Sequence, residues 1–150
     1  MLPVETIRLG SDELTVLASA TETGGDLFAV EVRMPPGGGP PVMHRHAPSE
    51  VYRVLTGELV FYTTTQHGTS RRVARAGETV TLAGHTPHTI RNESDAEAVA
   101  FSVHAPGGAM EGFARAAAAL AADGPPSMDD VIAVAQEHGI EMLGPVPVSA

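Results

Sequence analysis

Two histidines and a glutamate stand close together in the middle of the chain. His44, His46 and Glu50 lie in the stretch GGPPVMHRHAPSEVYRVLTG. Because side chains alternate between the two faces of an extended strand, His44 and His46 are expected on the same side. A turn at Pro48 would break the strand and bring Glu50 back beside both imidazoles. Imidazole and carboxylate ligands together suit a divalent first-row transition metal.

A second stretch further along the chain offers a fourth ligand. His88 follows Pro87 in the sequence AGHTPHTIRN, at the start of another segment with alternating apolar residues. Three neutral histidines and one carboxylate leave a divalent ion with about one net positive charge, and open positions could take water, dioxygen or a substrate oxygen. Iron, manganese, nickel, cobalt and zinc all fit this ligand set. We therefore predict one divalent transition metal bound by His44, His46, Glu50 and His88.

These stretches resemble the two sequence motifs of the cupin superfamily. The first motif, G-x5-H-x-H-x3-E-x6-G, is met at every position by Gly38, His44, His46, Glu50 and Gly57. The second motif, G-x5-P-x-G-x2-H-x3-N, is met at Gly77, His88 and Asn92, but Ala83 and His85 replace its proline and second glycine. Because glycine adopts backbone conformations that other residues avoid, Gly84 is expected to supply the freedom that this turn needs. The resemblance implies a barrel over roughly residues 26–104.

Several side chains near the predicted ligands are candidates for further roles. Glu50 could be a general base as well as a ligand, since a carboxylate that leaves a metal can accept a proton; the alternative is a ligand role alone. His85 could pass a proton to solvent, or it could be a solvated residue at the rim of the barrel. Tyr52 shares the strand parity of Glu50, so it either lines the cavity or packs in the core. His104 ends a strand and could face the cavity or the surface.

The elements that must position these residues are short strands followed by helices. Alternation and turn signals predict strands at 4–9, 13–18, 27–34, 51–55, 59–64, 71–75, 78–82, 88–91 and 97–104. In the last of these, Val99, Phe101 and Val103 share one face. Apolar residues then recur at helical spacing, which predicts helices within residues 109–139 and an extended tail. The predicted fold is all-β: one cupin barrel (a double-stranded β-helix, or jelly roll) with a C-terminal helical appendage, in a single domain over residues 1–150.

Composition disfavours several classes of protein. At 150 residues and 43% hydrophobic content, the chain can bury one core of its own. A net charge of -9 argues against nucleic acid and anionic membranes as partners, because both would repel the chain. The sequence has no cysteine, so it has no thiol chemistry. We find no signal-peptide pattern at the N-terminus and no membrane-spanning apolar stretch, and we therefore expect a cytoplasmic protein.

The C-terminal part also resembles small single-domain cupins of the quercetin-dioxygenase-like group. The resemblance is carried by HAPGG before the first predicted helix and HGIEMLGP after the second. It implies a metal-dependent dioxygenase that acts on a small, largely apolar molecule such as an enol or flavonol, and a helix pair that covers the barrel. Because one fold serves many reactions, a non-redox isomerase, cyclase or decarboxylase of secondary metabolism is the second interpretation. A non-catalytic cupin that binds a small molecule is the third. A homodimer formed through the N-terminal strands is also expected.

Overall fold

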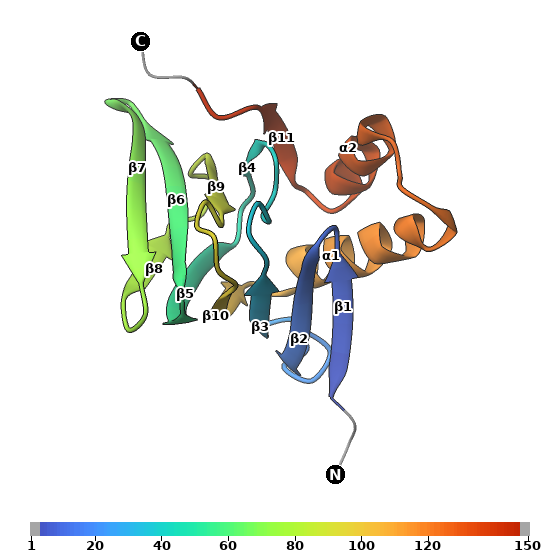
Figure 1. Cartoon of the computed structure of the whole chain (residues 1–150). Coiled ribbons are helices and arrows are strands. Elements are labelled where there is room, and N and C mark those ends of the chain that lie inside the picture. The colour runs from blue at the N-terminus through green and yellow to red at the C-terminus, as the bar shows by residue number, and fades with distance from the viewer. Residues whose placement is uncertain (1–3, 148–150) are drawn as a thin grey trace.

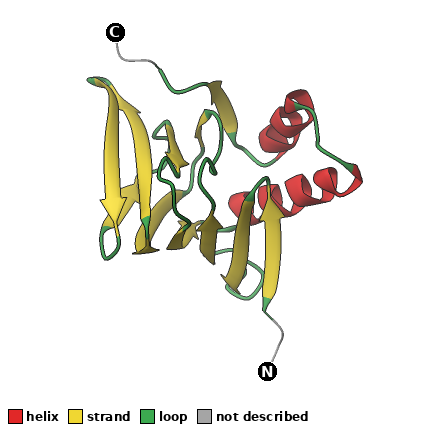
Figure 2. Cartoon of the chain, viewed as in Figure 1, coloured by secondary structure: helices red, strands yellow, loops and turns green. Residues whose placement is uncertain are grey.

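Two antiparallel sheets form the body of the molecule, and two helices lie beside them (Figure 1, Figure 2). The computed structural model describes residues 4–147. The strands are β1 (Glu5–Leu9), β2 (Asp12–Ala18), β3 (Phe28–Met34), β4 (Met43–Arg45), β5 (Ser49–Thr56), β6 (Glu58–Thr65), β7 (Gly68–Arg75), β8 (Thr79–Leu82), β9 (His88–Arg91), β10 (Ala98–Ala105) and β11 (Glu141–Gly144). The helices are α1 (Gly108–Leu120), the short 3-10 helix η1 (Ala121–Asp123) and α2 (Met128–Glu137). The predicted all-β fold with a C-terminal helical appendage is confirmed.

The order of strands brings distant parts of the sequence side by side. Within the described residues the first sheet has the order β1-β2-β3-β10-β5-β8, and the second has the order β11-β4-β9-β6-β7. The core fills the space between the sheets, with Phe28, Val54 and Phe61 almost completely buried. In β3 the buried side chains of Phe28, Val30 and Val32 alternate with the more exposed Glu31 and Arg33. This is the pattern of a strand that has one face on a core.

Strand β10 turns small and polar side chains inward and leaves two of its larger side chains only partly buried. Phe101 and Val103 share one face, as expected, but both are only partly buried. The opposite face carries small and polar residues, and Ser102 and His104 on it are fully or almost fully buried. Strand β10 pairs with β5 so that His104 lies opposite Glu50. The polar face of β10 therefore points toward the predicted ligands.

The turn before β9 differs from the expectation for Gly84. His85, not Gly84, takes the left-handed conformation, with φ of 66°. Gly84 is required for another reason, because a β-carbon there would lie 2.1 Å from the carbonyl oxygen of Ala47. The amide of His85 donates to the carbonyl oxygen of His46 at 2.7 Å. This turn is thus tied directly to the stretch that carries the first two histidines.

Asn92, the last residue of the second motif, is a buried structural residue. Its side chain is almost fully inaccessible. Its amide nitrogen donates to the carbonyl oxygens of Met34 at 2.9 Å and Ala96 at 2.8 Å, and its Oδ1 accepts from the amide of Ser94 at 3.0 Å. These hydrogen bonds connect the end of β9 to the end of β3. They also satisfy the polar groups of the amide, as a buried side chain requires.

The helices and the last strand close one end of the molecule. Phe113 and Ala117 of α1 form a small core with Ala135 of α2 and with Ile140. The side chain of Ser127 caps α2 by accepting from the amide of Asp130 at 3.1 Å. The tail then forms β11, which pairs with β4; the sequence predicted an extended tail but not this pairing. Figure 1 shows α1 beside the β1–β2 hairpin and β11 between β4 and α2. Among the described helices, none has the length and apolar content needed to cross a lipid bilayer.

Candidate metal centre

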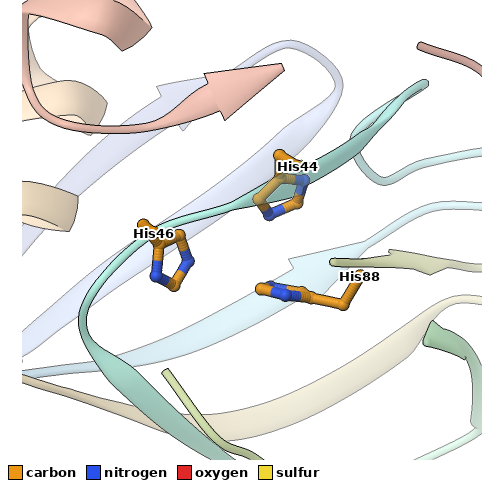
Figure 3. A group of neighbouring side chains, drawn as sticks. All are labelled: His44, His46 and His88. Atoms are coloured by element: carbon orange, nitrogen blue, oxygen red, sulfur yellow. The ribbon is translucent and has the colours of Figure 1, made fainter. Parts of the chain in front are cut away.

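The three predicted histidine ligands come together between two strands (Figure 3). His44 lies on β4, His46 follows that strand directly, and His88 begins β9. Strands β4 and β9 pair with His44 opposite His88, and the centroids of these two rings are 4.4 Å apart. One nitrogen from each ring lies within 4.8 Å of the other two. All three side chains are buried.

Backbone carbonyl groups orient each of the three rings. In every case the acceptor belongs to a residue two positions away: Val42 for His44 (3.4 Å), Pro48 for His46 (3.0 Å) and Thr86 for His88 (2.8 Å). Because a carbonyl oxygen can only accept, each Nδ1 atom carries a proton, which leaves Nε2 as the atom that can face a metal. This arrangement is typical of histidines that bind a metal, where the second nitrogen donates to a carbonyl or carboxylate.

Glu50 joins the histidines through one of its two oxygens. The turn at Pro48 separates β4 from β5 and returns Glu50 to the same side. Its Oε2 lies 2.6 Å from Nε2 of His88 and 3.3 Å from Nε2 of His46. Among the described residues none of these three buried atoms has an aligned hydrogen-bond partner. Buried polar atoms without partners are costly, so their convergence fits a bound cation.

The second oxygen of Glu50 faces a different set of side chains. The hydroxyl of Tyr52 donates to Oε1 at 3.0 Å, and Nδ1 of His104 lies 3.0 Å from the same atom. On its other side, the His104 ring contacts the hydroxyl of Ser102, 3.1 Å from Nε2. Tyr52 and His104 therefore both face the interior beside the site. The sequence left both positions open; the signal for His104 is its shared parity with Ser102, which lies on the polar face of β10.

The protonation states suit a metal ligand set. Burial, helped by the neighbouring His88, lowers the pKa of His44 to about 4, which leaves its imidazole neutral near pH 7. Burial alone would raise the pKa of Glu50, but its contacts with His104, His46 and His88 hold it well below its ordinary value. Burial opposes protonation of His88 as well, yet the contact with Glu50 raises its pKa overall. The site thus presents a carboxylate and at least one neutral imidazole.

A cavity of about 310 Å³ extends from this site toward the helices. Of the candidate ligands, His44 and Glu50 line it, together with Tyr52 and His104. Its apolar walls include Phe28 and Val32 of β3, Met110 and Phe113 of α1, Val131 of α2 and Met142 of β11. The volume is at the lower end of the range for small-molecule sites, and a mostly apolar wall with a few polar groups is typical of them.

Of two further polar residues, Asp12 lines this cavity and His85 does not. Asp12, predicted only as part of a turn, is buried and lines the cavity from the start of β2. Its Oδ1 atom has no hydrogen-bond partner in the part of the chain that the structure describes. His85 has an exposed side chain and is not among the described residues that line the cavity. The sequence could not place Asp12 here, because only the folded hairpin carries it to the cavity.

Comparison with known proteins identifies the family. The sequence profile of the Cupin domain matches residues 30–104. A search of curated proteins finds no match.

Solved structures with the same fold are distant in sequence. A sugar phosphate isomerase from a cupin superfamily of Silicibacter pomeroyi aligns with a TM-score of 0.53 at 21% identity, over 65% of this chain and 60% of that one. An RmlC-like cupin from Shewanella frigidimarina aligns with a TM-score of 0.57 at 21% identity, over 69% of this chain and 84% of that one. An oxalate decarboxylase variant from Bacillus subtilis gives 0.58 at 16% identity, over 68% of this chain and 27% of that one. At these identities the likeness concerns the fold.

Proposed function

The chain belongs to the cupin superfamily, and on that premise we propose that it is a metal-dependent enzyme, a dioxygenase, that acts on a small, largely apolar molecule. One observation carries this proposal: unpartnered buried atoms of His46, Glu50 and His88 converge beside an apolar cavity that His44 and Glu50 line. Such a site can hold a cation and a substrate next to each other.

The metal would be held by Nε2 of His44, His46 and His88 and by Oε2 of Glu50. Iron, manganese, nickel, cobalt and zinc are all compatible with these ligands. When bound, a cation of this kind supplies a Lewis acid that polarises a substrate oxygen. The backbone carbonyls that hold each Nδ1 atom fix the rings in the orientation that ligation needs.

The other residues of the site bind the substrate, exclude water and accept a proton. The apolar walls disfavour bound water, which strengthens electrostatic interactions beside the candidate ligands. Oε2 of Glu50 is our candidate acceptor for the proton of an enolic hydroxyl, while Oε1 stays in contact with Tyr52 and His104. From its exposed position, His85 is the candidate that passes a proton to solvent.

The lining favours an uncharged, apolar substrate. No arginine occurs among the described residues that line the cavity, and the sequence contains no lysine. Proteins usually bind phosphate and carboxylate groups with these side chains, so a strongly anionic substrate would have no counter-charge in the cavity apart from the metal itself. The sugar phosphate isomerase therefore shares the fold with this chain but is a poor guide to its substrate.

A non-redox enzyme is the second candidate, because proteins with this fold include one named an isomerase and one named a decarboxylase. The histidine and glutamate ligand set serves both kinds of chemistry. A non-catalytic binding protein is the third candidate. The three differ in their need for dioxygen and in whether the ligand is converted.

The test begins with metal and continues with dioxygen. Elemental analysis of the wild type and of His46→Ala should show about one metal per chain in the first and a large loss in the second. His67→Ala, at an exposed histidine of the β6–β7 turn, is the matched control. Equal metal in the wild type and His46→Ala would refute the metal site.

Oxygen uptake is then measured with a panel of enols and flavonols. Uptake that requires both substrate and metal supports the dioxygenase. Equal turnover without air supports the non-redox enzyme, and ligand binding without conversion supports a binding protein.

A homodimer formed through the N-terminal strands is part of the same proposal. Strand β1 ends the first sheet of the described chain, and Val4 and Leu17 beside this edge are exposed. An exposed edge with apolar side chains favours pairing with another strand. Light scattering of the wild type and of Leu17→Lys tests it. A cytoplasmic location and the lack of nucleic-acid partners are further parts of the proposal, and both are inferred from the sequence and its charge.

A further inference from the structure

We propose that Tyr52 and His104 are positioning residues that hold Glu50 so that Oε2 alone ligates the metal. The two oxygens of this carboxylate have different surroundings. Oε2 faces the histidines, 2.6 Å from Nε2 of His88. Oε1 faces away from them, 3.0 Å from both the Tyr52 hydroxyl and Nδ1 of His104. We call these two side chains together with Glu50 the Glu50 clamp.

Strand pairing, not flexible loops, positions the Glu50 clamp. Tyr52 is two residues from Glu50 on β5, so both side chains project from the same face. His104 lies directly opposite Glu50 on the neighbouring strand β10, and Ser102 lies opposite Tyr52. The Ser102 hydroxyl holds the His104 ring from its far side, 3.1 Å from Nε2. These four side chains are all buried.

The Glu50 clamp resists rotation of the carboxylate. To bring both oxygens to the metal, Oε1 would have to leave the Tyr52 hydroxyl. That hydroxyl would then be buried without its acceptor, which is unfavourable. Nδ1 of His104 has no aligned hydrogen-bond partner among the described residues and lies 3.0 Å from Oε1, so it gains a favourable electrostatic contact while Oε1 stays in this position. Both neighbours therefore favour ligation through one oxygen.

This restraint matters because of the number of coordination positions. A carboxylate that binds through one oxygen uses one position, and one that binds through both oxygens uses two. With three histidines in place, ligation through Oε2 alone would leave the metal one more open position than ligation through both oxygens. A substrate or a second small molecule could take that position. The inference rests on the metal site of the proposed function, but it does not depend on which reaction the enzyme performs.

The experiment uses Co²⁺ as the probe with the metal-free full-length protein. Co²⁺ affinity and its visible absorption spectrum are measured for the wild type, Tyr52→Phe, His104→Leu and His104→Asn. The amide nitrogen of Asn lies where Nδ1 of histidine was, so His104→Asn keeps the donor and His104→Leu removes it. The matched control is Tyr62→Phe, which removes the hydroxyl of a partly buried tyrosine that donates to Glu93 outside the site.

We expect Tyr52→Phe and His104→Leu to weaken Co²⁺ binding by about 10- to 100-fold, the usual effect of losing a residue that orients a ligand. Their spectra should also weaken, because Co²⁺ absorbs less strongly as its coordination number rises. His104→Asn should recover most of the affinity and the spectrum, which loss of packing alone would not explain. Tyr62→Phe should match the wild type.

The outcomes separate this inference from the proposed function. If the wild type does not bind Co²⁺, both are refuted. If the wild type binds Co²⁺ and Tyr52→Phe matches it in affinity and spectrum, the Glu50 clamp is refuted and the metal site stands. Tyr52→Phe decides the question even if His104→Leu fails to fold, because it removes a single oxygen atom.

Discussion

Oδ1 of Asp12 lies against Gly38, only 2.6 Å from the place where a β-carbon at position 38 would stand. Asp12 begins β2, whereas Gly38 begins the first cupin motif, so this contact joins the N-terminal hairpin to the loop before the ligands. Arg91 holds the same loop by donating to the carbonyl oxygens of Gly37 and Gly39. The first glycine of the motif is therefore required by close packing.

Gly38→Ala should lower the free energy of unfolding by about 1–3 kcal/mol, the usual cost of adding a methyl group to a closely packed site. The new carbon would also lie 2.7 Å from Cγ of Met34 and 2.9 Å from the carbonyl oxygen of Pro35. Gly108→Ala is the matched control, since a β-carbon there meets no atom within 4 Å. Denaturant unfolding gives both values, and an equal effect at the two positions would show that the contact with Asp12 is not restrictive.

The pH dependence of stability should reveal the burial of Asp12. Burial raises the pKa of this carboxyl to about 6 from 3.8, and it outweighs the opposing effects of the Gly39 amide and the Arg91 charge. The folded state therefore keeps this proton more tightly than the unfolded state, so the contribution of Asp12 to stability falls as pH rises from about 4 to about 6.

Asp12→Asn removes this titration. The thermal midpoint of the wild type, measured relative to Asp12→Asn, should increase as pH is lowered from 7 to 4. The exposed substitution Asp95→Asn controls for general charge effects. A difference between wild type and Asp12→Asn that stays constant with pH would contradict the raised pKa.

The convergence of the candidate ligands could be predicted from the sequence because their positions follow from local spacing. His44 lies on β4, His46 follows it directly, and Glu50 lies on β5 after a proline turn, so alternation and the turn are enough to place them on one side. The second motif added His88. The strand positions, too, follow from alternation and turn residues, which act over a few neighbours.

Asp12, His104 and the pairing of β11 could not be predicted because each depends on contacts between distant parts of the chain. For His104, alternation gives two faces but does not say which is buried. In the fold, β10 turns its small and polar residues inward toward the site and leaves Phe101 and Val103 only partly buried. For Asp12, only the position of the hairpin in the fold brings the carboxyl to the cavity.

His85→Gly should stabilise the protein by about 0.5–1 kcal/mol. His85 has a φ of 66°, and the left-handed conformation costs a residue with a β-carbon about 1–2 kcal/mol. Glycine avoids this cost but loses about 0.5–1 kcal/mol of backbone entropy on folding. His85→Ala keeps the β-carbon and should bring no such gain. Equal unfolding free energies for the Gly and Ala variants would show that the turn is not strained.

The same two variants test His85 in proton transfer. If the imidazole passes a proton to solvent, both substitutions should slow turnover, and small buffer bases should partly restore it. Unchanged turnover in both variants would leave His85 as a residue of the turn alone.

Glu50→Gln tests whether this residue does more than bind a metal. Glutamine keeps the shape and one oxygen ligand, so the fold and much of the metal should be retained. What is lost is the one carboxylate that, among residues 4–147, lies beside these histidines. A substrate hydroxyl bound there would have no strong base within hydrogen-bond reach. Turnover per bound metal should therefore fall by about 10²-fold or more, the usual scale of general-base catalysis.

The measurement must be expressed per bound metal, because a simple loss of metal would also lower total activity. Metal content and turnover are therefore determined on the same samples, and thermal midpoints verify that Glu50→Gln remains folded. Glu58→Gln, at a partly exposed position on β6, is the matched control and should leave both quantities unchanged, because its side chain forms an ion pair with Arg75 away from the site. Turnover per metal equal to that of the wild type would confine Glu50 to ligation. Water or His85 would then accept the proton. Partial rescue of His85→Ala by buffer bases would indicate His85 rather than water.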